Sequence, residues 1–428
     1  MFMTPQRFAL ALPLIVGMVF AGVATAHATP LITPSYATLP PASHPVALAG
    51  ASDGSVYSAN SDGTISSVDS HGVLTARAFD FGPTAHLCAM TIDDSGDLWV
   101  VNSGSGTVSI VNPGWGSVRT YGAPVTGAID CAITRPPGSA SPAYIVTDLV
   151  DSVTSISEVG VVDAAFGVLP PGAAPRAIAF DSSGSLYTAN SGLDTVSRIT
   201  ASGAVTADFA ALSAPTGTVE PRAIAVDSRN NVVVAGYASG SISRITPTGT
   251  VTPVVELDPS AQPRSLAMNA MGDLLYVDES DSSVSLIPGD GSAPSVLFDR
   301  PDGNSLPAVT ADRNGAITVA DATTNELMRI DLGARFRDTP TGPIALVTGV
   351  PFSYRFEATG NEPFTFRVPW TPSIPDGLSF DPATGILSGT PTKTGTFRVG
   401  FEVSNALSKS EYLATFIVTP GVRPAPHF

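Results

Sequence analysis

The chain has 428 residues, with 37 acidic against 21 basic side chains, a net charge of −16 and two cysteines. A surface this acidic repels nucleic acid and anionic lipid, which excludes nucleic-acid binding as the main function. The length exceeds that of one small domain, so we expect more than one.

Residues 1–28 have the pattern of a secretory signal peptide. Arg7 precedes the apolar run Phe8–Ala21, and the small residues of Ala24–Ala28 form A-x-A cleavage sites. An uncleaved anchor helix is the alternative, although the run is short for a bilayer span. We therefore expect an exported chain, secreted or held at the cell surface, with no membrane association after cleavage.

A repeat covers residues 31–332. The segment PRAIA occurs at Pro175 and again 46 residues later at Pro221. Each copy holds four short, alternating, β-branched segments bounded by turn residues, without a helical period. Seven copies align, and their first strands start at Pro45, Leu87, Asp130, Pro175, Pro221, Pro263 and Leu306. This pattern predicts an all-β chain that begins with a seven-bladed β-propeller.

The seventh copy lacks a fourth strand, because the chain runs from Leu327–Leu332 directly into Gly333. Residues 31–39 align with a fourth strand and stand before the first copy. A propeller must close to hide its strand edges. We therefore expect residues 31–39 to pair with the third strand of the last blade.

A second domain follows the repeats. Residues 333–341 indicate a linker, and alternating strands over residues 342–419 predict an immunoglobulin-like β-sandwich. Its turn Asp381–Gly385 is chemically specific, since Asp caps it, Pro sets φ and Gly takes the left-handed position. The Pro-rich residues 420–428 form a tail.

Two family resemblances rest on these segments. The block PDGLSFDPATGILSGTPTKTGTF (Pro375–Phe397) closely resembles the immunoglobulin-like domain of bacterial surface and secreted proteins, which implies an adhesive or spacer module without catalytic residues. The repeats resemble NHL-type and streptogramin-lyase-like propellers through the PRAIA starts, LYTAN at Leu186–Asn190 and SRITPTGTVT at Ser243–Thr252.

The lyases implied by this resemblance use histidines and an acid with a divalent metal. After the signal peptide this chain has no His-x-His or His-x-x-His pair, and its histidines are His44, His71, His86 and His427. Because the chain departs from the lyase pattern, we assign no catalytic residue, no metal ligand and no cofactor. A divalent metal is expected only if the lyase alternative holds.

The aligned copies place one ring of residues at the starts of the inner strands: Val46, Cys88, Cys131, Arg176, Arg222, Arg264 and Pro307. His44, His86, Glu220 and Gln262 lie two residues before this ring and share the same channel mouth. Three arginines on consecutive blades predict an arc that binds an anion such as a carboxylate, phosphate or acidic glycan. The alternative is that each arginine pairs with an acid such as Glu220 or Asp227 and locks blades together.

Other polar residues allow weaker interpretations. Asx residues end most second strands and could hold a cation, but their recurrence favours hydrogen bonds to their own turns. These residues are Asn60, Asn102, Asp148, Asn190, Asp278 and Asp321. His44 and His86 are either a metal pair or general base, or exposed loop histidines. Asp93, Asp94 and Asp97 indicate a solvated turn, because their spacing is not that of a calcium loop.

The only two cysteines, Cys88 and Cys131, occupy the ring position on neighbouring blades. In an exported chain this arrangement predicts a disulfide between blades two and three, with two buried thiols as the alternative.

Together these patterns predict a monomeric, exported binding protein whose propeller mouth recognises a small anionic molecule, a glycan or a protein. One alternative is a metal-dependent enzyme of the streptogramin-lyase or lactonase kind. A second alternative is an adhesive or structural protein of the cell surface.

Overall fold

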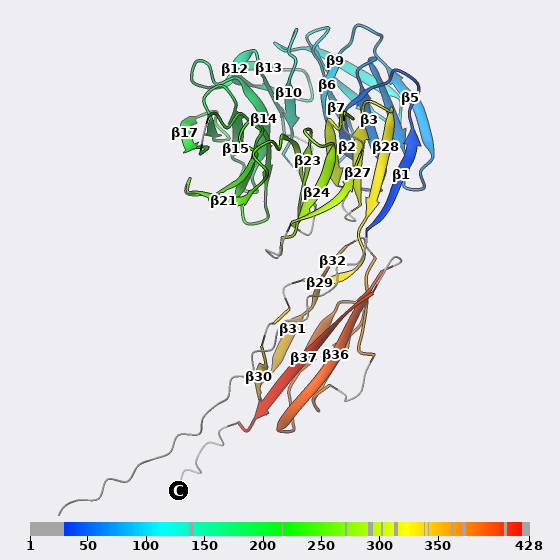
Figure 1. Cartoon of the computed structure of the whole chain (residues 1–428), viewed down its shortest axis with the longest axis vertical. Coiled ribbons are helices and arrows are strands. Elements are labelled where there is room, and N and C mark those ends of the chain that lie inside the picture. Colours follow the sequence, from blue (N-terminus) through cyan, green and yellow to red (C-terminus); the bar gives the residue numbers. More distant parts are fainter. Residues whose placement is uncertain are drawn as a thin grey trace, which may run out of the picture.

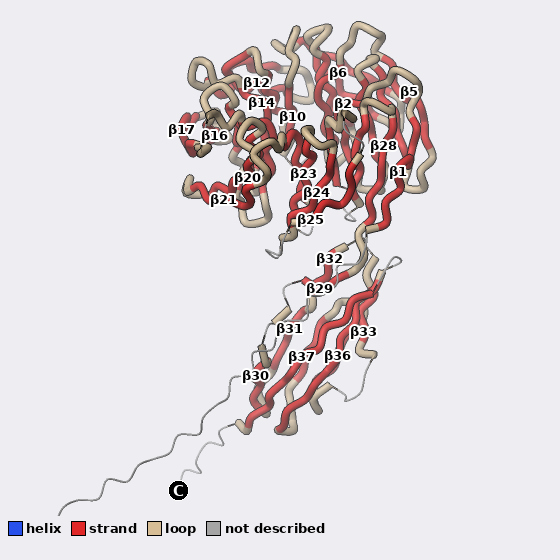
Figure 2. The backbone as a smooth tube through the Cα atoms, viewed as in Figure 1, coloured by secondary structure: helices blue, strands red, loops and turns tan. Residues whose placement is uncertain are grey.

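The computed structural model describes residues 30–421 apart from 137–140, 216, 270–271, 290–293, 301–302, 312–315, 338, 341, 361–362, 370–373 and 406–408. The predicted signal peptide and residues 422–428 of the predicted tail lie outside the described residues. All helix or strand structure in the described part is strand (Figure 2), and that part contains no helix able to cross a membrane.

Strands β1 to β28 form seven four-stranded sheets, each a blade of a propeller (Figure 1), which confirms the predicted fold. The inner strands are β2 (Pro45–Gly50), β6 (Leu87–Ile92), β10 (Cys131–Thr134), β14 (Pro175–Phe180), β18 (Pro221–Val226), β22 (Pro263–Met268) and β26 (Ala308–Ala311). The second strands are β3 (Val56–Asn60), β7 (Leu98–Asn102), β11 (Ala143–Thr147), β15 (Leu186–Asn190), β19 (Val232–Gly236), β23 (Leu274–Asp278) and β27 (Ile317–Asp321).

The outer half of each blade completes its sheet. The third strands are β4 (Thr64–Val68), β8 (Thr107–Asn112), β12 (Val150–Ile156), β16 (Thr195–Ile199), β20 (Ser241–Ile245), β24 (Ser283–Ile287) and β28 (Glu326–Asp331). The outer strands are β5 (Leu74–Asp80), β9 (Ser117–Gly122), β13 (Val162–Val168), β17 (Val205–Ala211), β21 (Val251–Glu256), β25 (Ser295–Asp299) and β1 (Leu31–Thr38).

The second strands form the centre of the core. Every residue of β15 is buried, and the same holds for β7 and β19, because adjacent blades cover both faces of each sheet. Between blades one and two, Leu98 and Val100 pack in one cluster with Ala59 and Ile65. These strands are therefore nearly continuous apolar runs.

The N-terminal segment completes the seventh blade. Strand β1 pairs antiparallel with β28, with Leu31 opposite Asp331. Ala37 and Leu39 are buried in a cluster that also contains Leu327. The first described strand and the last strand of the propeller thus lie side by side (Figure 1) and close the ring of sheets.

The C-terminal module has three sheets built on an aromatic core. Their orders are β30-β37-β36-β33, β31-β35-β34 and β29-β32. The strands are β29 (Arg335–Arg337), β30 (Ile344–Val347), β31 (Phe352–Arg355), β32 (Glu357–Thr359), β33 (Thr365–Arg367), β34 (Leu378–Asp381), β35 (Ile386–Gly389), β36 (Gly395–Ser404) and β37 (Lys409–Thr419). Phe356, Phe401 and Phe416 are almost fully buried between the sheets.

Two details of this module bear on the sequence predictions. The turn after β34 forms as predicted, since Asp381 Oδ1 accepts the Ala383 N–H at 2.9 Å and Gly385 has a φ of 69°. The predicted linker differs from the structure, because its residues 335–337 form β29. Phe336 packs against Phe356 there, and burial of its aromatic ring holds residues 335–337 against the core of the module.

Candidate functional site

In five of the seven blades a β-bulge lies at the ring residue. In blade four the register between β14 and β15 shifts between Pro175 and Ala177, so Arg176 stands at the irregularity. Blades one, two, five and six have the same shift. Ala174, just before the strand, has a φ of 44°, which turns the chain sharply into the channel. A bulge changes the direction of the side chain at the irregular position, so these side chains face the channel mouth and not the paired second strand.

The seven ring residues line one cavity of about 340 Å³. The structure therefore brings together the positions that the repeat alignment made equivalent. Arg176, Arg222 and Arg264 form its polar side on blades four to six, with Asp130 beside them. The remaining wall is apolar and includes Val46, Leu87, Ile129, Pro307 and the Cys88–Cys131 disulfide.

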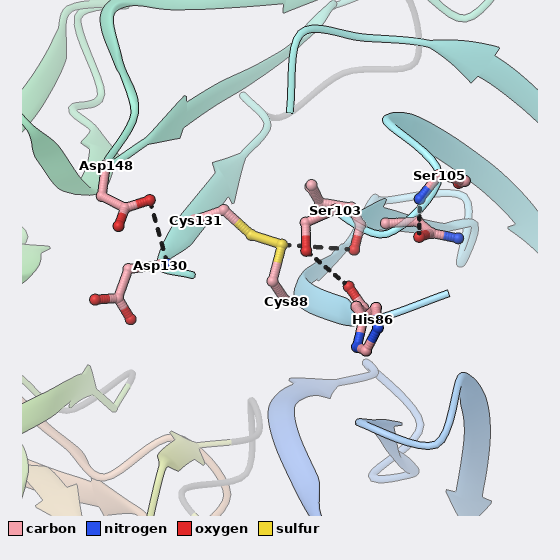
Figure 3. Close-up of a disulfide and its surroundings, with 9 residues drawn as sticks. His86, Cys88, Ser103, Ser105, Asp130, Cys131 and Asp148 are labelled. Atoms are coloured by element: carbon pink, nitrogen blue, oxygen red, sulfur yellow. Dashed lines mark hydrogen bonds between the residues drawn. A yellow bond between two sulfur atoms is a disulfide. The ribbon is translucent and has the colours of Figure 1, made fainter. Parts of the chain in front are cut away.

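The predicted disulfide forms between Cys88 and Cys131, whose Cα atoms are 5.9 Å apart. It joins the inner strands of blades two and three, β6 and β10. Figure 3 shows Asp130 and Asp148 on the Cys131 side and His86 with Ser103 on the Cys88 side. The inner strands of two blades are thus covalently linked at the mouth, and the bond is part of the cavity wall.

Arg176 already has a counter-ion and a hydrogen-bond acceptor. Its guanidinium forms an ion pair with Asp130 of blade three, and its Nε donates to Ser191 Oγ at 3.0 Å. The Asp130 N–H in turn donates to Asp148 Oδ1 at 3.4 Å. This arginine therefore links two blades and has its counter-ion in place.

Arg264 is engaged in a similar way. Its Nη1 donates to Glu279 Oε1 at 2.7 Å within blade six. The Tyr237 hydroxyl lies 3.1 Å from both Glu279 Oε2 and Gln262 Oε1, and it donates to these oxygens across the boundary between blades five and six. Burial, and then the charge of Glu279, raise the pKa of Tyr237, which keeps this hydroxyl protonated as a donor.

Arg222 is held differently from the other two arginines. Its guanidinium carbon lies 3.7 Å from the centroid of the Tyr237 ring, a cation–π contact. Its ion pair with Glu220 is long, 3.5 Å between Nη2 and Oε2. Its Nε is buried and has no hydrogen-bond partner in the described part of the chain. Arg222 thus keeps an unsatisfied donor at the cavity.

The mouth is therefore close to charge-balanced. The pairs Arg176–Asp130, Arg222–Glu220 and Arg264–Glu279 set three cations against three carboxylates. Asp227, which the sequence analysis also considered as a partner, pairs with Arg244 at 3.8 Å instead. Only Arg176–Asp130 joins two blades, so the blade-locking alternative describes one of the three arginines.

The two mouth histidines have backbone roles. The His44 N–H donates to Asn325 Oδ1 at 2.7 Å, and its Nδ1 lies 2.7 Å from the Ala322 carbonyl oxygen of blade seven. The His86 carbonyl accepts the Ser103 N–H at 3.1 Å. Both residues have positive φ, 45° and 48°, as the entry to an inner strand requires. His44 thus links blades one and seven, whereas the His86 contact lies within blade two.

A divalent metal does not fit this mouth. The cavity presents three guanidinium groups, and the carboxylates beside them are already paired with those cations. Among the described residues no group of three or more His, Cys, Asp or Glu side chains has the arrangement of a metal site.

The Asx residues bond mainly within their own blades, except that Asp321 of blade seven also pairs with Arg300, which follows the outer strand of blade six. Asn190 is fully buried and donates to Thr195 Oγ1 at 3.1 Å and to Ser197 Oγ at 2.9 Å. Asp278 Oδ1 accepts the Ser280 and Gln262 N–H groups, both at 2.9 Å. These contacts hold the turns that frame the mouth and account for the recurrence of Asx in the repeats.

A buried charge cluster on the opposite face was missed by the sequence analysis. The Arg135 side chain is 1% exposed, forms ion pairs with Asp93 and Glu158, and lies over the Trp99 ring. Asp93, expected in a solvated turn, has a side chain that is only 7% exposed and also accepts the Trp99 Nε1–H at 3.1 Å. No other repeat has an arginine at the position of Arg135, so the alignment did not indicate this charge cluster.

The fold and the mouth define a class: a seven-bladed propeller with a ligand-sized central cavity, followed by an immunoglobulin-like module. The chain belongs to the virginiamycin B lyase family, which it matches over residues 33–330. Residues 335–421 match the family described as Putative Ig domain. No curated protein matches the chain.

Solved structures show the same propeller. A streptogramin B lyase has a TM-score of 0.63 at 19% identity, covering 71% of this chain and 98% of its own. A catalytically inactive histidine-to-alanine variant of virginiamycin B lyase from Staphylococcus aureus, with quinupristin, has a TM-score of 0.60 at 17% identity and 70% and 99% coverage. The extracellular domain of a putative hybrid two component system from B. thetaiotaomicron has a TM-score of 0.51 at 13% identity, with 91% and 57% coverage. At these identities the likeness concerns the fold.

Proposed function

We propose that this protein is an exported binding protein that recognises a small ligand at the propeller mouth without transforming it. The observation that carries the proposal is the mouth cavity itself, about 340 Å³ and lined by three partly exposed arginines opposite an apolar wall. A concave pocket in which a few convergent polar groups lie beside apolar side chains is a common form of small-molecule site.

Export is supported by two independent features. The N-terminal sequence has the signal-peptide pattern, and the Cys88–Cys131 disulfide suits an oxidising compartment. The immunoglobulin-like module then serves as a spacer or second contact. One contact between this module and the end of the propeller is a hydrogen bond in which Asn405 Nδ2 donates to the Leu332 carbonyl at 3.1 Å.

The main alternative is a metal-dependent lyase or lactonase, which family membership favours. The inactive Staphylococcus aureus variant indicates that a histidine is required in that enzyme. In this chain no histidine occurs between His86 and His427, so blades three to seven contain none. The pairing of the mouth carboxylates with arginines further opposes a bound divalent metal. These features support binding over catalysis.

The second alternative is an adhesive or structural protein of the cell surface. A protein-binding propeller would use an exposed apolar patch, whereas the observed mouth is polar, paired and concave. The immunoglobulin-like module is the part of the chain that this alternative explains best.

The test uses the mature chain and a panel of neutral oligosaccharides, sugar acids and aromatic carboxylates, screened by thermal shift and measured by calorimetry. Val46→Trp fills the cavity, while Val73→Trp introduces the same side chain at a 62% exposed position outside it. Recognition at the mouth predicts that Val46→Trp abolishes binding and Val73→Trp preserves it. Binding that survives Val46→Trp would place the site elsewhere.

Catalysis is tested separately with quinupristin, the molecule bound to the Staphylococcus aureus variant. Mass spectrometry over several hours, with and without Mg²⁺, follows the intact compound. We expect no conversion above the protein-free control. Metal-dependent conversion would overturn the non-catalytic proposal and establish the lyase alternative.

A further inference from the structure

The three mouth arginines differ in how much bonding capacity they retain. Arg176 and Arg264 each hold a carboxylate closely, and Arg176 also donates its Nε to Ser191. Arg222 holds its carboxylate only at 3.5 Å and leaves its Nε without a partner. Because its ion pair is long and its side chain is 23% exposed, Arg222 is the mouth arginine with the most capacity to bind a new acceptor.

Glu220 is anchored in a way that leaves its carboxylate free to move. Its N–H donates to Asp194 Oδ1 at 2.8 Å, and its φ of 47° fixes the turn into β18. Its side chain is nevertheless 42% exposed, and its carboxylate contacts Arg222 only through the long ion pair. The backbone can therefore stay in place while the carboxylate leaves Arg222.

Arg222 itself is pre-organised to receive an anion. Stacking on Tyr237 at 3.7 Å fixes the guanidinium plane, and the Tyr237 hydroxyl is held by Gln262 and Glu279 of the next blade. A fixed, planar guanidinium binds a carboxylate through two parallel N–H donors. The Nε is itself buried, so these donors come from the terminal Nη1 and Nη2 groups of a side chain that is 23% exposed.

The rest of the cavity selects the body of the ligand. Opposite the arginines lie Val46, Leu87, Pro307 and the disulfide, and Ile224 and Leu266 line the wall near Arg222. Burial of apolar surface against such a wall is favourable. The cavity of about 340 Å³ is near the lower end of the usual range for small-molecule sites, roughly 300–1,000 Å³.

We propose that the mouth binds a small monocarboxylate with an apolar body, and that its carboxylate replaces Glu220 on Arg222. This inference rests on the proposed function of the mouth. A dianion fits less well, because Asp130 and Glu279 already neutralise the other two arginines and would repel a second negative charge. Glu220 is then a built-in counter-ion that occupies the site until the ligand arrives.

The experiment compares 2-naphthylacetate with 2-naphthylacetamide, which share one apolar body and differ in charge. Calorimetry on the mature wild-type chain should give at least tenfold tighter binding of the acetate. Arg222→Gln should reduce acetate affinity to that of the amide. Glu220→Gln should raise acetate affinity severalfold and leave the amide unchanged, because the competing charge is gone.

Arg244→Gln is the matched control, since Arg244 pairs with Asp227 outside the cavity lining. It should leave both probes at wild-type affinity. Equal affinity of the two probes, no binding of the acetate, or weaker acetate binding by Glu220→Gln would overturn the inference. If equal binding is still blocked by Val46→Trp, recognition at the mouth stands and only the carboxylate specificity fails.

Discussion

The disulfide gives the most quantitative prediction about this propeller. Cys88 and Cys131 are 43 residues apart, so their bond closes a loop that contains the rest of blade two and the entry to blade three. In the chain-entropy treatment a closed loop of this length stabilises the folded state by about 4 kcal/mol. The variant Cys88→Ala/Cys131→Ala should lose about that much free energy of unfolding.

Urea unfolding followed by tryptophan fluorescence measures this loss. Trp99 and Trp115 lie in blade two and its turns, so a Trp370→Phe background removes the only other tryptophan and leaves a propeller signal. Reduced wild-type protein should unfold at the midpoint of the double variant, and reductant should not affect the variant. A double variant as stable as the oxidised wild type would refute the loop-entropy reasoning.

Three further predictions concern ring closure. Arg300 pairs with the fully buried Asp321 at 3.3 Å and with Glu326 at 2.6 Å. Arg300→Met should therefore lower the free energy of unfolding by about 3 kcal/mol, whereas Arg77→Met, at an exposed ion pair, should lower it by at most about 1 kcal/mol. Equal shifts of the melting temperature in the two variants would contradict this. Burial raises the pKa of Glu326, but hydrogen bonds from Ser35, Arg300 and Thr324 outweigh it and hold the pKa below 4.5. The contribution of ionised Glu326 to folding stability is therefore complete above that pH and is lost as the pH falls through the folded pKa. In thermal melts at a series of pH values, Glu326→Gln should reduce the fall of the melting temperature at acid pH. Deleting residues 30–39 exposes the edge of β28 and should give a chain that associates in light scattering, whereas a monomer with wild-type melting would show that β1 is dispensable.

Much of the fold follows directly from the repeats. Because each blade is a copy of one four-stranded unit, aligning the copies gave the blade number, the missing outer strand and the ring of equivalent positions. The same alignment paired Cys88 with Cys131, and the structure joins them. Residues 31–39 were expected opposite the third strand of the last blade, and β1 pairs with β28.

The state of the candidate site was decided by the tertiary structure. Asp130 and Glu279 come from turns where the copies differ, so the alignment could not show that they engage Arg176 and Arg264. Nor could it show that Arg222 stacks on Tyr237 and is only loosely paired with a carboxylate. The sequence by itself determined the seven ring positions that line the cavity, since periodicity sets the position of each strand. The cavity lining does not include the other predicted mouth residues, His44, His86, Glu220 and Gln262. Charge pairing across turns and blade boundaries depends on side-chain geometry in three dimensions, and only the folded chain fixed which arginine keeps a free donor.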